Sequence, residues 1–146
     1  MPRTVLCLRI VGALALFAVA ADHLYEYYAD HYSAIPTIGP LFLLNGIGAT
    51  ALGLILLAPV GRLLPGRLAG WVVALAGAAG AGLAASSLAG LFVSETEPLF
   101  GFMEIGYRPV VVVAIASEAI AVVALAFLVL LTWRGGRRPS RLRPAV

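Results

Sequence analysis

The sequence carries little charge and no lysine. Aspartate, glutamate and arginine together make up 12% of its 146 residues, against roughly a quarter in soluble domains, and 62% of the residues are hydrophobic. The mean hydropathy of +1.01 therefore indicates a chain whose main solvent is lipid. The pI near 9.5 does not indicate a nucleic-acid partner, because basic residues clustered beside apolar spans usually set membrane topology and meet anionic lipid.

Motifs of familiar enzyme chemistry are also missing. The sequence has no Walker loop, no Gly-x-Ser-x-Gly elbow, no His-Glu-x-x-His motif and no Cys-x-x-Cys pair. Cys7 is the only cysteine, so no disulfide can form within the chain, and we interpret it as a small apolar side chain. These absences favour a protein that is not an enzyme, and they identify no cofactor.

Four long apolar stretches account for most of the chain. They cover about residues 5–28, 41–57, 68–92 and 109–133, and each is close to or longer than the roughly 20 residues that cross a hydrocarbon core. Pro59 ends the second stretch, and Pro109 opens the fourth, where its missing N–H costs little. We therefore predict an all-α fold, an integral membrane four-helix bundle that forms one domain over residues 1–146, with a basic cytoplasmic tail at 134–146.

Arginine is distributed unevenly about these stretches. Only Arg108 lies at one end of the predicted bundle, and nine arginines lie at the other: Arg3, Arg9, Arg62, Arg67, Arg134, Arg137, Arg138, Arg141 and Arg143. Because basic loops stay in the cytoplasm, we predict that both the N-terminus and the C-terminus are cytoplasmic. The arginine, alanine and glycine usage suggests a bacterial gene, and hence the bacterial inner (plasma) membrane. So strong a bias also excludes an antiparallel dimer.

The N-terminus has a second interpretation. Ala18-Val19-Ala20 before Asp22 matches the small-residue pattern at which a signal peptidase cleaves, and cleavage after Ala20 would leave three spans. The alternative is a first span that is retained.

Small residues recur every fourth position along the third stretch. Such spacing lets two helix backbones approach closely in a membrane, so we interpret this stretch as the central packing helix. The same face is the predicted contact for a second copy or a partner membrane subunit, and it consists of Gly70, Ala74, Ala78, Gly82, Ser86 and Gly90.

Acidic and histidine side chains gather at the outer end of the first stretch. On a continuous helix the carboxylates Asp22, Glu26 and Asp30 share one face, and His23 and His31 lie on the adjoining face. Stacked carboxylates repel one another unless water, protons, a cation or an arginine neutralises them. Arg108 is the arginine that could reach across. If Arg9 marks the inner interface, Asp22 and His23 lie within the membrane; if Arg9 snorkels, they reach the outer interface.

Glu118 lies in the middle of a long apolar segment of the sequence. It lies 15 residues before Trp133, or about 22 Å along a helix, near the predicted depth of His23. An acid inside a membrane is expensive unless it is paired, protonated or facing water, and so it indicates function. The alternative is a protonated glutamic acid that bonds across helices. Asn45, in the second stretch, adds an amide at a similar depth.

These residues predict a pocket in the outer half of the bundle. His23, Glu26, Asn45 and Glu118 would line it, and the apolar loops at 34–40 and 98–107 would roof it. The alternative is an ordinary aromatic belt with interfacial loops. We expect no metal site, since His23-x-x-Glu26 reverses the Glu-x-x-His order of di-iron bundles.

Two resemblances accompany these residues. His23-Leu24-Tyr25, Ile35-Pro36-Thr37-Ile38-Gly39 and Leu41-Phe42-Leu43-Leu44-Asn45 resemble a pattern in small four-span actinobacterial membrane proteins, which carries no assigned activity. The four-helix outline is similar to DoxX-like membrane proteins, some of which are linked to quinone or thiol redox chemistry. Cys7 alone supplies no thiol pair for that chemistry.

Together these observations predict a membrane protein that binds a small ligand, a lipid or a partner subunit through an outer-leaflet polar cluster. One alternative is a proton- or cation-coupled small transporter that uses Glu118. The other is a metal or quinone redox protein that uses His23, Glu26 and Glu118.

Overall fold

The computed structural model describes residues 2–136, and every regular element in that part of the chain is helical. The predicted all-α fold is therefore confirmed for the described residues. In chain order the elements are α1 (Arg3–Tyr28), the 3₁₀ turn η1 (Tyr32–Ala34), α2 (Ile38–Leu57), α3 (Val60–Leu63), α4 (Gly66–Ser94) and α5 (Pro109–Gly136).

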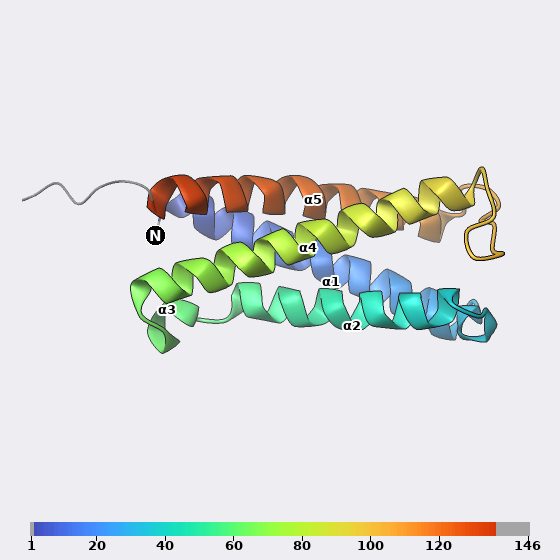
Figure 1. Cartoon of the computed structure of the whole chain (residues 1–146), viewed down its shortest axis with the longest axis horizontal. Helices are drawn as coiled ribbons and strands as arrows, with labels where there is room; N and C mark the ends of the chain where they lie inside the picture. The colour runs from blue at the N-terminus through green and yellow to red at the C-terminus, as the bar shows by residue number, and fades with distance from the viewer. Residues whose placement is uncertain (1, 137–146) are drawn as a thin grey trace, which may run out of the picture.

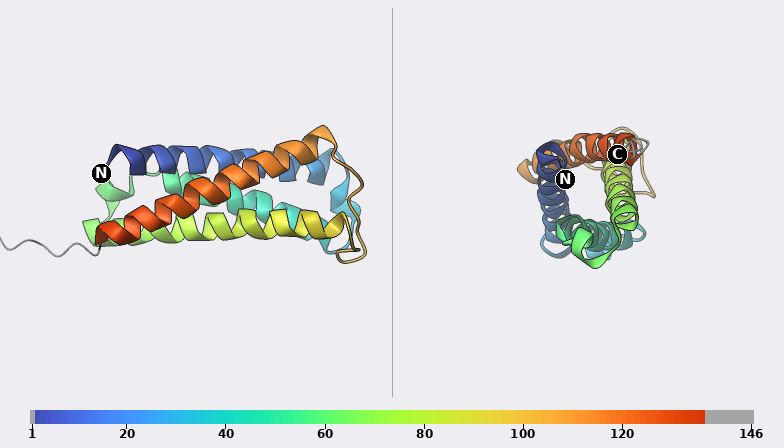
Figure 2. Two further views of the ribbon diagram at one scale, coloured as in Figure 1. Left: turned by 90° about the horizontal axis from the view of Figure 1, so that it is seen from above. Right: turned by 90° about the vertical axis from the view of Figure 1, so that its left-hand side faces the viewer.

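The four long helices form an antiparallel bundle (Figure 1). Viewed along its axis, they stand at the corners of a square, with α1 beside α2 and α5, and α4 beside α5 and α2 (Figure 2). Each is long and apolar enough to cross a membrane. Many large apolar side chains point outward along them, including Leu14, Leu75 and Phe127, as on helices that face lipid.

The two ends of the bundle differ in charge. The basic end holds Arg3, Arg62, Arg67 and Arg134, and the acidic end holds the loop between α1 and α2 and the longer loop between α4 and α5. Arg137, Arg138, Arg141 and Arg143, which contribute to the predicted orientation and to the predicted tail, lie outside the described residues.

Helix α1 ends before two of the polar residues that were predicted to stack along it. Its last residue is Tyr28, so Asp30 and His31 follow the helix and do not continue its faces. His31 has a left-handed backbone with φ of 61° and is exposed. At the other end, the helix begins at Arg3 and runs unbroken past Ala20, where its buried face packs in the core.

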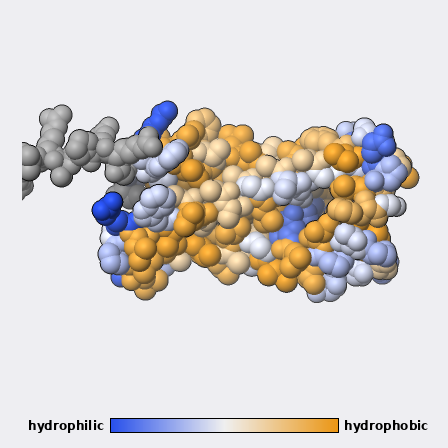
Figure 3. Space-filling view, viewed as in Figure 1, coloured by the Kyte–Doolittle hydropathy of each residue, from blue (hydrophilic) through white to orange (hydrophobic). Residues whose placement is uncertain are grey.

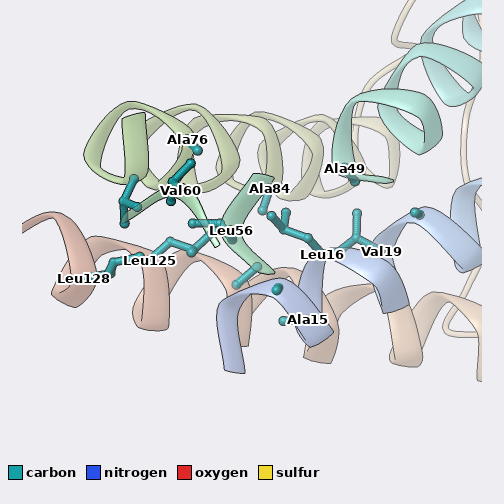
Figure 4. Packing of buried hydrophobic residues seen from close by; sticks show 14 of the residues in the cluster. Ala15, Leu16, Val19, Ala49, Leu56, Val60, Ala76, Ala84, Leu125 and Leu128 are labelled. Atoms are coloured by element: carbon teal, nitrogen blue, oxygen red, sulfur yellow. The ribbon is translucent and has the colours of Figure 1, made fainter. Parts of the chain in front are cut away.

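The core of the bundle is filled by fully buried leucines. Leu16, Leu56, Leu125 and Leu128 have no exposed surface and lie one after another between the helices (Figure 4). Glycine permits this close packing, because a Cβ added at Gly12 would overlap Cδ2 of Leu125. The cavity described below therefore does not extend through an open core.

The small-residue face of α4 is not the face that packs within the bundle. The positions of α4 that are buried are Ala69, Val73, Ala76, Gly77, Gly80, Ala84 and Ser94. Gly70 and Gly82, from the predicted face, have nothing within 4 Å of an added Cβ. The prediction of a central packing helix is wrong, because the rotation of α4 in the bundle packs another series, Ala76, Gly80 and Ala84, against its neighbours and turns much of the predicted face outward. Contact of this face with another subunit stays a prediction.

Arg9 is buried inside the basic half of the bundle. Its Nε donates to the carbonyl oxygen of Leu56 at 3.0 Å, and its Nη2 donates to the carbonyl oxygen of Ala58 at 3.0 Å. These carbonyls end α2, where the last turn lacks intrahelical partners and the helix dipole is negative. Arg9 thus joins α1 to the end of α2. The sequence had suggested two roles for Arg9, a marker of the inner interface or a snorkelling residue, and neither included this interaction.

We predict that Arg9→Met destabilises the bundle. The variant removes charged donors from buried carbonyls, and we expect the free energy of unfolding to fall by about 2 kcal/mol. Unfolding in mixed micelles, followed by circular dichroism, measures the change. The matched control is Arg3→Met, since Arg3 is exposed on the same helix. Equal stability of the two variants would contradict this role of Arg9.

Candidate functional site

His23, Ser87 and Glu118 meet in the acidic half of the bundle. Nε2 of His23 lies 3.0 Å from Oγ of Ser87 and 3.8 Å from Oε1 of Glu118. The three side chains come from α1, α4 and α5, and the exposed fractions of His23 and Glu118 are only 4% and 1%. Residues far apart in the sequence therefore form one buried polar group at a single level of the bundle.

The hydrogen bonds of His23 define its tautomer. Nδ1 lies 2.9 Å from the carbonyl oxygen of Val19, which can only accept, so Nδ1 carries a hydrogen. In the neutral ring Nε2 is then an acceptor, to which the hydroxyl of Ser87 can donate. One proton held on either Nε2 or the carboxyl of Glu118 leaves this pair without net charge, which a buried acid requires.

Three oxygen atoms near this group lack partners. Oδ2 of Asp22, Oδ1 of Asn45 and Oε2 of Glu118 are buried, and no hydrogen-bond donor within the described chain reaches them. An unsatisfied buried acceptor costs about 1–3 kcal/mol, so native proteins rarely leave several together without a use for them.

These atoms belong to residues that line a cavity of about 510 Å³. Its polar side chains include Asp22, His23, Glu26, Asn45 and Glu118, and most of the remaining lining is apolar, including Phe42, Leu83, Leu91 and Phe102. A volume of this size is within the range of small-molecule sites.

The cavity opens sideways between α2 and α4. Leu41 and Leu44 of α2 and Ser86 of α4 line it and are themselves exposed. Helices α2 and α4 diverge towards the acidic end in Figure 1, and Figure 3 shows hydrophilic side chains recessed in the apolar side of the bundle at this place. The opening therefore faces the apolar outer surface.

Arg108 organises the acidic end above the cavity. Its Nη1 donates to Asp30 at 2.6 Å, and its Nη2 donates to Glu26 at 3.1 Å and to the hydroxyl of Tyr32 at 2.9 Å. Its Nε also donates to Glu104 at 3.3 Å. We call these five residues the Arg108 cluster. It joins the end of α1, the first loop and the second loop, and contact of Arg108 with the α1 acids was one of the alternatives that the sequence left open.

Tyr32 completes this cluster and begins the roof of the cavity. Its hydroxyl donates to Oε2 of Glu104 at 2.6 Å, and its ring contacts Phe42 and Phe102 edge-on. Burial and the bond to Glu104 raise the pKa of Tyr32, and the bond to Asp30 raises the pKa of Arg108. Both side chains therefore keep their protons, and the cluster retains its donors.

The structure brings most of the predicted site residues together. Asp22, His23, Glu26, Asn45 and Glu118 line the cavity, whereas Asp30 and Arg108 lie in the cluster above it. His31 is exposed and does not line the cavity.

Three contributors were missed in the sequence. These are Ser87, Glu104 and Tyr32, none of which was among the candidate residues singled out in the sequence. Pairing of Ser87 with His23 spans 64 residues, so no local spacing could indicate it. Within the described residues, no three or more His, Cys, Asp or Glu side chains are arranged to hold a metal ion.

We predict that Arg108→Met loosens the acidic end. Glu26 and Glu104 lose their counter-charge, and we expect a loss of about 1–3 kcal/mol in stability, with faster amide hydrogen exchange in the loop 98–107. Arg108→Lys keeps the charge but not the branched donors, so its effect should be intermediate. Exchange measured by mass spectrometry tests this, with exposed Arg67→Met as control. Unchanged loop exchange in Arg108→Met would count against the cluster.

Comparison with known proteins found no relative of this chain. No family model, curated protein or solved structure matches the chain.

Proposed function

We propose that this protein is a multi-pass protein of the bacterial inner membrane, with both termini cytoplasmic, that binds a small ligand or lipid in the cavity between α2 and α4. The observation that carries the proposal is the cavity itself, in which partnerless polar atoms of Asp22, Asn45 and Glu118 lie behind an apolar sideways opening. A site of this form suits a molecule with an apolar body and one polar end.

The proposed orientation puts the site in the outer leaflet. Arginine marks the basic end as cytoplasmic by the positive-inside rule. Glu118 follows Pro109, the first residue of α5, by nine positions, or about 14 Å along the helix. A ligand therefore enters the cavity from the outer half of the bilayer, without crossing the membrane.

Proton- or cation-coupled transport by Glu118 is the second candidate function. The pair of Glu118 and His23 supports it, because a buried acid beside an imidazole can take up and release a proton. Transport also needs a path to the basic end, and the buried leucines Leu16, Leu125 and Leu128 fill the core in that direction. Binding requires no such opening and is therefore our first proposal.

Filling the cavity should displace the bound molecule. Gly90 lines the cavity, and an added Cβ there would make an ordinary contact of 3.5 Å with Leu99, so Gly90→Phe directs a ring into the space. We expect native mass spectrometry of the protein from membranes to show a bound lipid or small molecule that Gly90→Phe lacks. The control is Ala89→Phe, one position along and exposed. A species that both variants retain, or its absence from the wild type, would refute the proposal.

The orientation has its own test in a Cys7→Ser background. Glu97 lies in the acidic-end loop and Arg62 in α3, and both are exposed. A membrane-impermeant maleimide added to intact spheroplasts should label Glu97→Cys, and label Arg62→Cys only after lysis. A reporter fused after Val146 should be found inside the cell. The reverse pattern would show that the acidic end is cytoplasmic.

A further inference from the structure

We propose that the ligand of the cavity is a lipophilic amine, whose positively charged ammonium group lies against Asp22 and Glu118. This inference rests on the proposed binding function and adds the chemical class of the ligand. It begins from the character of the partnerless atoms: Oδ2 of Asp22, Oδ1 of Asn45 and Oε2 of Glu118 are all oxygens.

Oxygen acceptors need donors. An ammonium group brings up to three N–H donors and no acceptor, which matches three partnerless oxygens. A quinone, a carboxylate or a fully ionised phosphate presents acceptors to acceptors, and so it leaves the same oxygens unsatisfied. While Asp22 and Glu118 are ionised, the cavity therefore selects against anionic and acceptor-only head groups.

The charge balance around the cavity favours a cation over a neutral donor. The acids Asp22, Glu26, Asp30 and Glu104 accompany the pair of His23 and Glu118, and within residues 2–136 the ion pairs of these acids with arginine are those to Arg108. The nitrogens of Arg108 already bond Glu26, Asp30 and Glu104 in the roof. Asp22, which is only 6% exposed, receives none of these bonds. Protons neutralise such acids when the cavity is empty, and an added cation does so when it is filled.

The apolar walls favour an organic cation over a bare ion. A metal ion needs several converging ligands to replace its water, and within residues 2–136 no suitable cluster exists. The cavity instead offers aromatic and leucine side chains, including Phe42 and Phe102, which solvate an alkyl body and attract an ammonium through their ring faces. The sideways opening between Leu44 and Ser86 lets the body remain in contact with the bilayer.

Three probes with one alkyl chain test the inference: octylamine, octanol and octanoate. Their binding is measured to the full chain in nanodiscs of zwitterionic lipid, with empty nanodiscs subtracted for partitioning into lipid. We expect octylamine to bind at least tenfold more tightly than octanol, and octanoate to show no saturable binding. Glu118→Gln and Asp22→Asn should each weaken octylamine at least tenfold and change octanol less than twofold. Glu97→Gln, an exposed acid outside the cavity, is the matched control and should change neither.

The outcomes separate this inference from the proposed function. Equal affinity for octylamine and octanol, or octylamine binding that survives both acid variants, overturns the cationic ligand while leaving a site that Gly90→Phe still blocks. Octylamine binding that Gly90→Phe leaves unchanged overturns the use of the cavity itself. Because Glu118→Gln keeps the side-chain size, gel filtration and thermal unfolding show that its lost binding does not come from misfolding.

Discussion

Arg108 is the only arginine in the two loops that close the acidic end, and the arrangement of that end depends on how its donors are shared. Several carboxylates cannot lie close together in an apolar bundle unless each finds a proton, a donor or a cation. The guanidinium has a fixed fork of donors, so it can bond acids from different segments at once. By bonding Glu26, Asp30 and Glu104 it fastens the end of α1 to the loop after α4.

The bonds of Arg108 in the roof determine which donors are left for the acids deeper in the bundle. The donors of Arg108 are occupied in the roof, so Asp22 and Glu118, deeper in the bundle, depend on other partners. Glu118 has His23 at 3.8 Å for one oxygen, and its second oxygen has no partner in the described chain. The deeper oxygens of the cavity therefore receive none of the donors that Arg108 supplies to the roof.

Local patterns in the sequence were enough to predict the bundle and the outline of the site. Hydropathy defines the four helices, and spacing along one helix brings Asp22 and Glu26 to one face of it, with His23 on the adjoining face. The rotation of one helix against another is not local, so the partnership of His23 with Ser87 could not be predicted. The same limit explains the error on α4, where a stripe of small residues was assigned to the wrong side. His31 was misplaced because a helix that ends at Tyr28 carries no periodicity beyond it.

The two halves of the site differ in how firmly they are held. His23 and Glu118 lie on α1 and α5, which pack along their length and meet at buried leucines such as Leu16 and Leu125. The mouth is formed by α2 and α4, the least closely packed pair of neighbours in the square, which diverge at this end (Figure 1). Polar groups that recognise a ligand need fixed positions, whereas entry from a bilayer needs a wall that can part. This difference between a firmly packed polar side and a loosely packed mouth supports ligand binding in the cavity, rather than the alternative of an ordinary aromatic belt with interfacial loops.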